Sequence, residues 1–341
     1  MRSVVIDTPG SVRVDNVADP VLSDQRGAIV QVRSAAICGS DLHFYDGDYP
    51  LMAPVSLGHE AVGTVVEVGR DVSAVAVGDE VLVSSIAGCG ACAGCDTGNP
   101  ATCVHGPQVF GAGALGGAQS ELLAVPAADF QLLRLPEHID TEQALLLTDN
   151  LATGWAGARR ADFAPGDDVV VLGLGAVGLC AVISALELGA ARVWAVDPVP
   201  GRRASAERLG ATPIAPPASD FVFEATQGRG PAAVIDAVGS DQTMTDALTM
   251  VRAGGTVSVI GVHNLDPFPF PATMSLLRSI TLRMTVAPVQ QTWPELVPRL
   301  QDGSIDVTGI FSQTVPLGEA PAAYENVAAR SGDCIKVALT M

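Results

Sequence analysis

The chain has 341 residues, 48% of them hydrophobic and 16% charged, which indicates a globular protein with room for two domains. Its formal net charge of -18 argues against a nucleic-acid partner, because phosphate backbones are bound through clustered lysines and arginines and this chain has a single lysine. The first residues lack an apolar segment followed by a small-residue cleavage site. We therefore expect no signal peptide and a cytoplasmic location, where disulfides are rare.

The first part of the chain is predicted to be β-rich. Short apolar runs at residues 28–37 and 61–69 are separated by Gly, Pro and Asp, which favour turns. Cys38 follows the first run, and His59 and Glu60 precede the second. Cysteine and histidine both bind zinc, and a catalytic zinc has three protein ligands and one open position. Taken alone, Cys38 has the equal alternative of a small buried residue, and His59 that of a turn residue.

Four cysteines lie close together in the spacing C-x2-C-x2-C-x7-C: Cys89, Cys92, Cys95 and Cys103. Zinc binds four thiolates tetrahedrally, and short C-x2-C steps wrap a loop around one ion. Disulfides would strain so tight a loop, which leaves thiol exchange by one C-x2-C pair as the remaining alternative. Because one segment would supply all four ligands and leave no open position, we predict a structural zinc site in a lobe spanning about residues 88–104.

A strand, a tight turn and a helix are predicted for residues 169–188. The turn carries G-x-G-x-x-G, in which the backbone and the helix start approach a pyrophosphate. The residues of this pattern are Gly173, Gly175, Ala176, Val177 and Gly178. Asp197 ends the next predicted strand, where a carboxylate accepts hydrogen bonds from ribose hydroxyls and repels a 2′-phosphate. We therefore predict NAD as the cofactor.

Two alternatives accompany this segment. Residues 169–186 carry no charge over about the length that spans a bilayer, but the glycine spacing and the β-branched first half favour a strand–turn–helix unit over a membrane span. Arg202 and Arg203 could each approach a phosphate, which leaves NADP as the alternative cofactor.

Three motifs in this order resemble those of the zinc-dependent medium-chain alcohol dehydrogenases, over essentially the whole chain. The residues similar to that family's zinc signature are Gly58, His59, Glu60, Gly63, Gly69 and Val72. The resemblance implies Cys38 and His59 as ligands of a catalytic zinc, with Asp149 as the third ligand where many members have a cysteine. An aspartate here is typical of the secondary-alcohol and formaldehyde dehydrogenase-like branches. A helix N-cap is the alternative role of Asp149.

The same resemblance implies roles for the remaining site residues. Ser40 would contact the substrate oxygen and His43 would carry the proton outward, with an ordinary loop position as the alternative for His43. Glu60 would lie beside the zinc, and Arg202 would lie over the adenine. Residues 279–286 would form an edge strand that pairs with a second copy, so we expect a homodimer or homotetramer.

These observations predict an α/β fold with two domains. A GroES-like β-rich catalytic domain (residues 1–150 and 288–341) would hold an inserted Rossmann domain with a doubly wound parallel sheet (residues 151–287). The predicted activity is reversible oxidation of a small alcohol, secondary or cyclic, to a ketone or aldehyde, with one zinc in each site and hydride transfer to NAD. The alternatives are a polyol or formaldehyde-type dehydrogenase, a zinc-independent reductase, and a non-enzymatic redox sensor. We expect no membrane partner.

Overall fold

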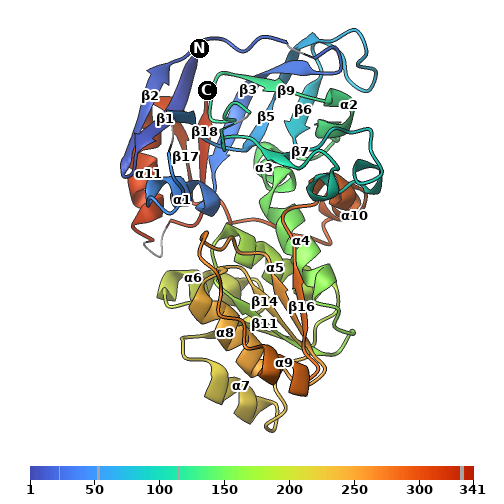
Figure 1. Cartoon of the computed structure of the whole chain (residues 1–341), viewed down its shortest axis with the longest axis vertical. Helices are drawn as coiled ribbons and strands as arrows, with labels where there is room; N and C mark the ends of the chain where they lie inside the picture. The colour runs from blue at the N-terminus through green and yellow to red at the C-terminus, as the bar shows by residue number, and fades with distance from the viewer. Residues whose placement is uncertain (23, 52–53, 114, 331–333) are drawn as a thin grey trace.

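Two large β-sheets organise the chain, one built from both ends of the sequence and the other from its middle (Figure 1). The structure, a computed structural model, describes residues 1–341 except 23, 52–53, 114 and 331–333. Within these residues the first sheet consists, in spatial order, of β10 (Leu132–Arg134), β6 (Glu80–Val83), β5 (Glu60–Val68), β3 (Ala28–Ile37), β18 (Val337–Thr340) and β17 (Gln313–Pro316), with β9 (Leu122–Val125) paired to β3.

Smaller elements complete this first body. They are the strands β1 (Arg2–Thr8), β2 (Ser11–Asn16) and β4 (Val55–Ser56), the pair β7 (Ile86–Ala87) and β8 (Gln108–Val109), and the short helices α1 (Leu42–Tyr45) and α2 (Ala128–Gln131). Val4 and Ile6 of β1 are buried in the same core as Val30 and Val32 of β3. The small three-stranded sheet therefore packs its apolar face on the large one, as alternating strand residues allow.

The second sheet is parallel throughout and has the strand order of a dinucleotide-binding fold. Its described strands are, in spatial order, β13 (Thr212–Ile214), β12 (Arg192–Val196), β11 (Asp168–Leu172), β14 (Ala233–Asp236), β15 (Thr256–Val259) and β16 (Thr281–Met284). Numbered along the chain this is the order 3-2-1-4-5-6 of the doubly wound Rossmann sheet. The predicted fold class is confirmed.

Helices cover both faces of the parallel sheet. One face carries α4 (Asn150–Arg160), α5 (Ala176–Glu187) and α6 (Pro200–Arg208), and the other carries α7 (Ser219–Ala225), α8 (Asp241–Met250) and α9 (Ala272–Leu277). Val169 and Val171 of β11 are buried toward the first set, and Val170 and Leu172 toward the second. None of the helices in the described part of the chain has the length and apolar character that crossing a bilayer would need. The uncharged segment is β11 followed by α5.

The chain returns to the first sheet after residue 288. Helix α10 (Val289–Gln301) packs against α3 (Thr141–Thr148) and α4, and the Trp293 indole donates a hydrogen bond of 3.1 Å to the carbonyl of Leu147. After α11 (Ala320–Ala328), strand β18 pairs antiparallel with β3. Because of this pairing, the blue strand β3 and the red strand β18 lie side by side in Figure 1. This pairing brings the C-terminal residues next to the end of β3.

Gly154 sets how closely α4 approaches α5, and α4 begins at the candidate site. A Cβ at position 154 would lie 2.6 Å from the backbone nitrogen of Ala181 in α5, closer than van der Waals contact permits. We predict that Gly154→Ala lowers the free energy of unfolding by about 1–3 kcal/mol. Gly318→Ala is the control, since nothing lies within 4 Å of its added Cβ. Thermal and urea unfolding of both variants measure the difference, and equal stabilities would contradict the steric argument.

Candidate functional site

The end of β3 and the start of β5 bring the first candidate ligands together. These strands are antiparallel, with Ala36 opposite Glu60, so Cys38 just beyond β3 lies beside His59 just before β5. Ligand atoms of Cys38, His59, Glu60 and Asp149 all lie within 4.8 Å of one another, and all four residues are buried. The sequence-predicted residues therefore form one cluster between β3, β5 and the start of α4. We call it the Cys38 cluster.

Asp149 occupies the N-cap position of α4, but its side chain makes no capping hydrogen bond. Its Oδ1 accepts a bond of 2.9 Å from the Ser85 hydroxyl. Its Oδ2 lies 3.7 Å from the Sγ of Cys38 and 3.7 Å from the Nε2 of His59. The N-cap alternative for this side chain is therefore wrong, and the carboxylate points into the cluster.

Asp41 orients the imidazole of His59. Its Oδ1 lies 3.2 Å from the Nδ1 of His59, while its Oδ2 accepts hydrogen bonds from the backbone of Cys38 and from Gln119 Nε2. The hydroxyl of Tyr324 in turn donates to Gln119 Oε1 at 2.8 Å. A histidine held in this way at Nδ1 presents Nε2 to its other neighbours, here the cluster.

The charges around His59 raise its pKa. Burial lowers that pKa, but the charges of Asp41 and Cys38 outweigh it and hold the value well above the usual one. Burial would raise the pKa of Asp149, yet the hydrogen bond and charge of His59 lower it overall. The buried negative charges around His59 therefore favour a positive charge next to its Nε2 atom. Either a proton or a metal ion can supply that charge.

Glu60 lies at the back of the cluster and is paired with Lys336. Lys336 Nζ donates a hydrogen bond of 2.8 Å to Glu60 Oε1, and both side chains are 0% exposed. Asn150 Nδ2 donates to the same oxygen at 3.2 Å. Burial raises the pKa of Glu60, opposed by the charge of Lys336. Among the described residues, Glu60 Oε2 has no hydrogen-bond partner although it is buried.

The donor set of the Cys38 cluster fits a zinc ion. A thiol, an imidazole and a carboxylate are the ligand types of catalytic zinc sites, in which a fourth position stays open. Cys38, His59 and Asp149 come from three separate segments, whereas a structural site in one loop would close around its ion. The orphaned Glu60 Oε2 adds a buried acceptor that faces no protein donor among the described residues.

The four predicted cysteines of the lobe also gather around one point. Cys89 Sγ lies 4.0 Å from Cys95 Sγ, and Cys92 Sγ lies 4.0 Å from Cys103 Sγ. Four sulfurs at ~2.3 Å from one ion would lie about 3.8 Å apart, so this spacing fits tetrahedral zinc. All four are free thiols. Backbone N–H groups of Val104 and Cys95 lower the pKa of Cys92 to about 6, whereas burial raises the pKa of Cys95.

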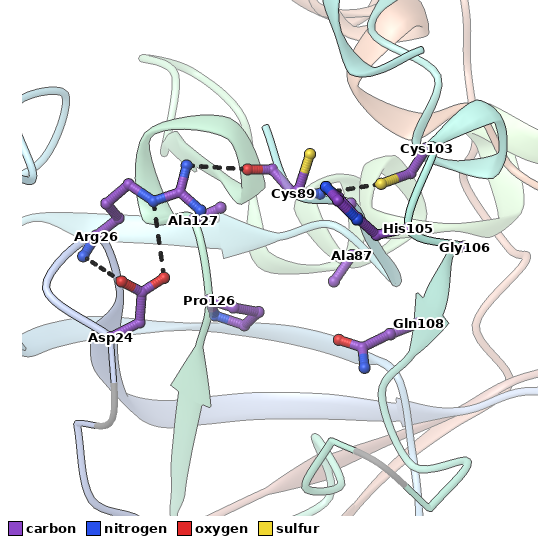
Figure 2. A pocket seen from close by; sticks show the side chains of 11 residues that line it. Asp24, Arg26, Ala87, Cys89, Cys103, His105, Gly106, Gln108, Pro126 and Ala127 are labelled. Carbon is purple, nitrogen blue, oxygen red and sulfur yellow. Dashed lines mark hydrogen bonds and ion pairs between the residues drawn. The ribbon is translucent and has the colours of Figure 1, made fainter. Parts of the chain in front are cut away.

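A small pocket of about 180 Å³ lies beside this lobe, lined in part by Cys89, Cys103 and His105 (Figure 2). Arg26 also lines it; its side chain donates to the carbonyl of Cys89 at 3.1 Å and pairs with Asp24. The pocket belongs to the cysteine lobe, since its lining residues include Cys89 and Cys103 and none of the four residues of the Cys38 cluster. We assign it no substrate.

The glycine pattern has the geometry that dinucleotide binding requires. Gly173 adopts a φ of 84° after β11, and Gly175 caps α5, whose first turn contains Ala176 and Val177. A Cβ on Gly178 would lie 1.8 Å from the carbonyl oxygen of Gly173, so only glycine fits there. The start of α5 is thereby held close to the end of β11, with its first N–H groups free to face an anion.

Asp197 directly follows β12 and lies beside this turn. Its carboxylate accepts hydrogen bonds of 2.8 Å from the backbone of Leu174 and of Val199. Arg202 lies 3.9 Å from that carboxylate, and Arg203 donates to the carbonyls of Asp197 and Pro198. The adenine contact of Arg202 stays a prediction.

Ser40 and His43 lie close to the cluster in sequence but outside it. Ser40 is in the short 3-10 helix Gly39–Asp41, half-buried. His43 lies in α1, where its Nδ1 is 2.9 Å from Asp48 and its ring stacks on Tyr49 at 5.0 Å. Their proton-transfer roles stay predictions.

Several partners of the cluster could not be found by motif. They are Ser85, Gln119, Asn150, Tyr324 and Lys336, and the last of these lies 276 residues from its partner Glu60. One signal was available: a single lysine within an apolar C-terminal strand segment is an unusual place for a charge.

Comparisons with known proteins agree with this geometry. The family model of the alcohol dehydrogenase GroES-like domain matches residues 24–137, and that of the zinc-binding dehydrogenases matches residues 176–302. A probable zinc-binding alcohol dehydrogenase of Mycobacterium tuberculosis is 62% identical over 339 residues, which cover 99% of this chain and 88% of that protein. The solved alcohol dehydrogenase TADH from Thermus sp. ATN1 is 37% identical with a TM-score of 0.92, over 100% of this chain and 99% of that one.

A second solved structure, zinc-dependent alcohol dehydrogenase 2 from Streptococcus pneumonia in its apo form, is 31% identical with a TM-score of 0.91. It covers 100% of this chain, and 98% of that chain is matched. Together with the family models and the two metal-type clusters, these likenesses extend over both sheets. The chain belongs to the zinc-dependent medium-chain dehydrogenases, the alcohol dehydrogenase family.

Proposed function

We propose that this protein oxidises a secondary or cyclic alcohol to the ketone, reversibly, with zinc at the Cys38 cluster and NAD as hydride acceptor. The observation that carries the proposal is the meeting of Cys38, His59 and Asp149 in one buried cluster. A zinc ion held there would polarise the alcohol oxygen, and NAD would accept the hydride. The aspartate in this ligand set supports the secondary-alcohol class by its resemblance to that branch.

The chain's own residues supply position and proton transfer. Asp41 fixes the ring of His59, and Ser85 fixes the carboxylate of Asp149. Both metal-binding side chains are therefore held in place before a metal ion or a substrate binds. Ser40 would take the hydroxyl proton, and His43 would pass it outward, with Asp48 holding the Nδ1 of His43. The alcohol or ketone is the small-molecule partner.

The choice of NAD over NADP rests on the charges at the end of β12. The buried carboxylate of Asp197 would repel a 2′-phosphate. Arg203 already donates to two backbone carbonyls and so offers less to a phosphate. The four free thiols of the cysteine lobe also suit a reducing compartment, which is why we propose a cytoplasmic location.

The metal assignment predicts different outcomes for two cysteine variants. Wild-type protein should hold about two zinc ions per chain, and Cys38→Ala and Cys92→Ala should each lose about one. In Cys38→Ala the rate at which NAD is reduced should fall by about 100-fold or more, because no metal ion polarises the alcohol oxygen. The rate is measured over a panel of primary, secondary, cyclic and polyol substrates. Cys92→Ala should keep activity while unfolding at lower temperature. NADH binding should persist in Cys38→Ala, and its loss would indicate misfolding instead.

The cofactor assignment predicts the effect of removing one charge. Asp197→Asn should lower the preference for NADH over NADPH by about tenfold, or about 1.4 kcal/mol, since repulsion of the 2′-phosphate is lost. Fluorescence titration with each reduced cofactor measures both dissociation constants. Asp168→Asn, at the N-terminal end of β11 and paired with Arg192, is the matched control and should leave the ratio unchanged. Tighter binding of NADPH by the wild type would refute the NAD assignment.

We propose further that the protein forms a homodimer or a homotetramer through β16. This strand lies at the edge of the parallel sheet, and apolar side chains are exposed beside it, including Leu276 and Leu277 (78% and 80%) and Met284 (55%). Exposed edge strands readily pair with a second chain.

Charge placed at this edge should separate the copies. We predict a dimer or tetramer by light scattering for the wild type and a smaller species for Met284→Lys, which would set like charges against each other across a two-fold axis. Phe221→Lys, on α7, removes a similarly exposed apolar side chain (48%) elsewhere and should leave the oligomeric state unchanged. A monomeric wild type would refute this assembly.

A further inference from the structure

Lys336 is the one lysine of the chain, and it is buried beside the proposed metal site. Besides its 2.8 Å bond to Glu60, its Nζ donates to the carbonyl of Ile37 at 3.4 Å and lies 5.7 Å from the ring of Phe311. Taking an ammonium group out of water is costly unless its partners are well placed. A lysine in this position therefore needs a reason beyond filling the core.

Glu60 is the residue through which Lys336 can act. Its carboxylate is close enough to share one ion with Cys38, His59 and Asp149, and its Oε1 is 3.9 Å from His59 Nε2. Three protein ligands leave one position open on a tetrahedral ion, and Glu60 as the fourth would close it. Whether Glu60 binds the metal thus decides whether a substrate can.

We infer that Lys336 is a positioning residue that holds Glu60 away from the metal and keeps the fourth position free. Lys336 and Asn150 both donate to Oε1, the Glu60 oxygen that lies 3.9 Å from His59 Nε2, so the lone pairs of the oxygen beside the ligands are already bonded to protein donors. This inference rests on the proposed function, because it needs a metal at the Cys38 cluster. A lysine that only neutralised the charge of Glu60 would not affect the metal. A positioning role predicts instead that the coordination of the ion changes when the ammonium group is removed.

The test removes the ammonium group and follows the metal. In Lys336→Met, whose side chain is similar in length and apolar, Glu60 should swing onto the metal. Release of the ion to a chelator should then slow by about tenfold, because a fourth protein ligand must also leave the ion. The visible absorption of the cobalt-substituted protein should change with the coordination. Subtracting the spectrum of Cys38→Ala, which keeps only the ion of the cysteine lobe, isolates the signal.

Three further variants decide between positioning and a structural role. Lys336→Arg keeps the charge and should behave as wild type, and Glu60→Gln/Lys336→Met should lose the slow release because no carboxylate can coordinate. Arg192→Met removes a cation from the surface pair with Asp168 and should leave metal release unchanged. If Lys336→Met does not fold, Lys336→Gln carries the same test.

Metal release and a cobalt spectrum equal to those of wild type, with or without lower thermal stability, would overturn the inference, and so would faster release. A wild type that holds one zinc per chain, lost in Cys92→Ala, would instead refute the proposed metal site itself. The two failures are therefore distinct.

Discussion

The structure depends on compensating several charged groups that the fold removes from water together. Cys38, His59, Glu60 and Asp149 are all buried, and an isolated charge in such a place would cost several kcal/mol. Each therefore has a partner: Asn150 for Cys38, Asp41 for His59, Ser85 for Asp149 and Lys336 for Glu60. This cluster is stable only if segments from distant parts of the sequence meet at one point.

That requirement accounts for the path of the chain. Strand β18 must return after the whole parallel sheet, because only its pairing with β3 brings Lys336 to Glu60. Tyr324 of α11 arrives by the same return and reaches Asp41 through Gln119. The parallel sheet is thus inserted between segments that share one polar network, and α4 connects it directly to Asp149. A displacement of α4 or of the C-terminal strands should disturb the ligand side chains before it reaches the apolar cores.

Local patterns allowed much of this to be predicted, and their limits are physical. Gly173 and Gly178 could be placed because a tight turn and a close helix approach each demand glycine at a fixed spacing. The four cysteines could be grouped because they lie in one short loop. Lys336 could not be paired with Glu60, since no local rule connects residues 276 apart. For Asp149, the local preference for an N-cap yields to tertiary hydrogen bonds, which sequence alone leaves open.

Charge balance also explains why an aspartate suits the third ligand position of this cluster. A thiolate and a carboxylate carry the same negative charge, so Cys38 and Asp149 together would match the two positive charges of zinc as two thiolates would. Glu60 and Lys336 form a separate neutral pair. If Glu60 moved onto the metal, the ligand set would carry an unmatched negative charge and Lys336 would be left as an unpaired buried cation. The metal with its two anionic ligands and the Glu60–Lys336 pair are therefore each neutral only while Glu60 stays bonded to the ammonium group.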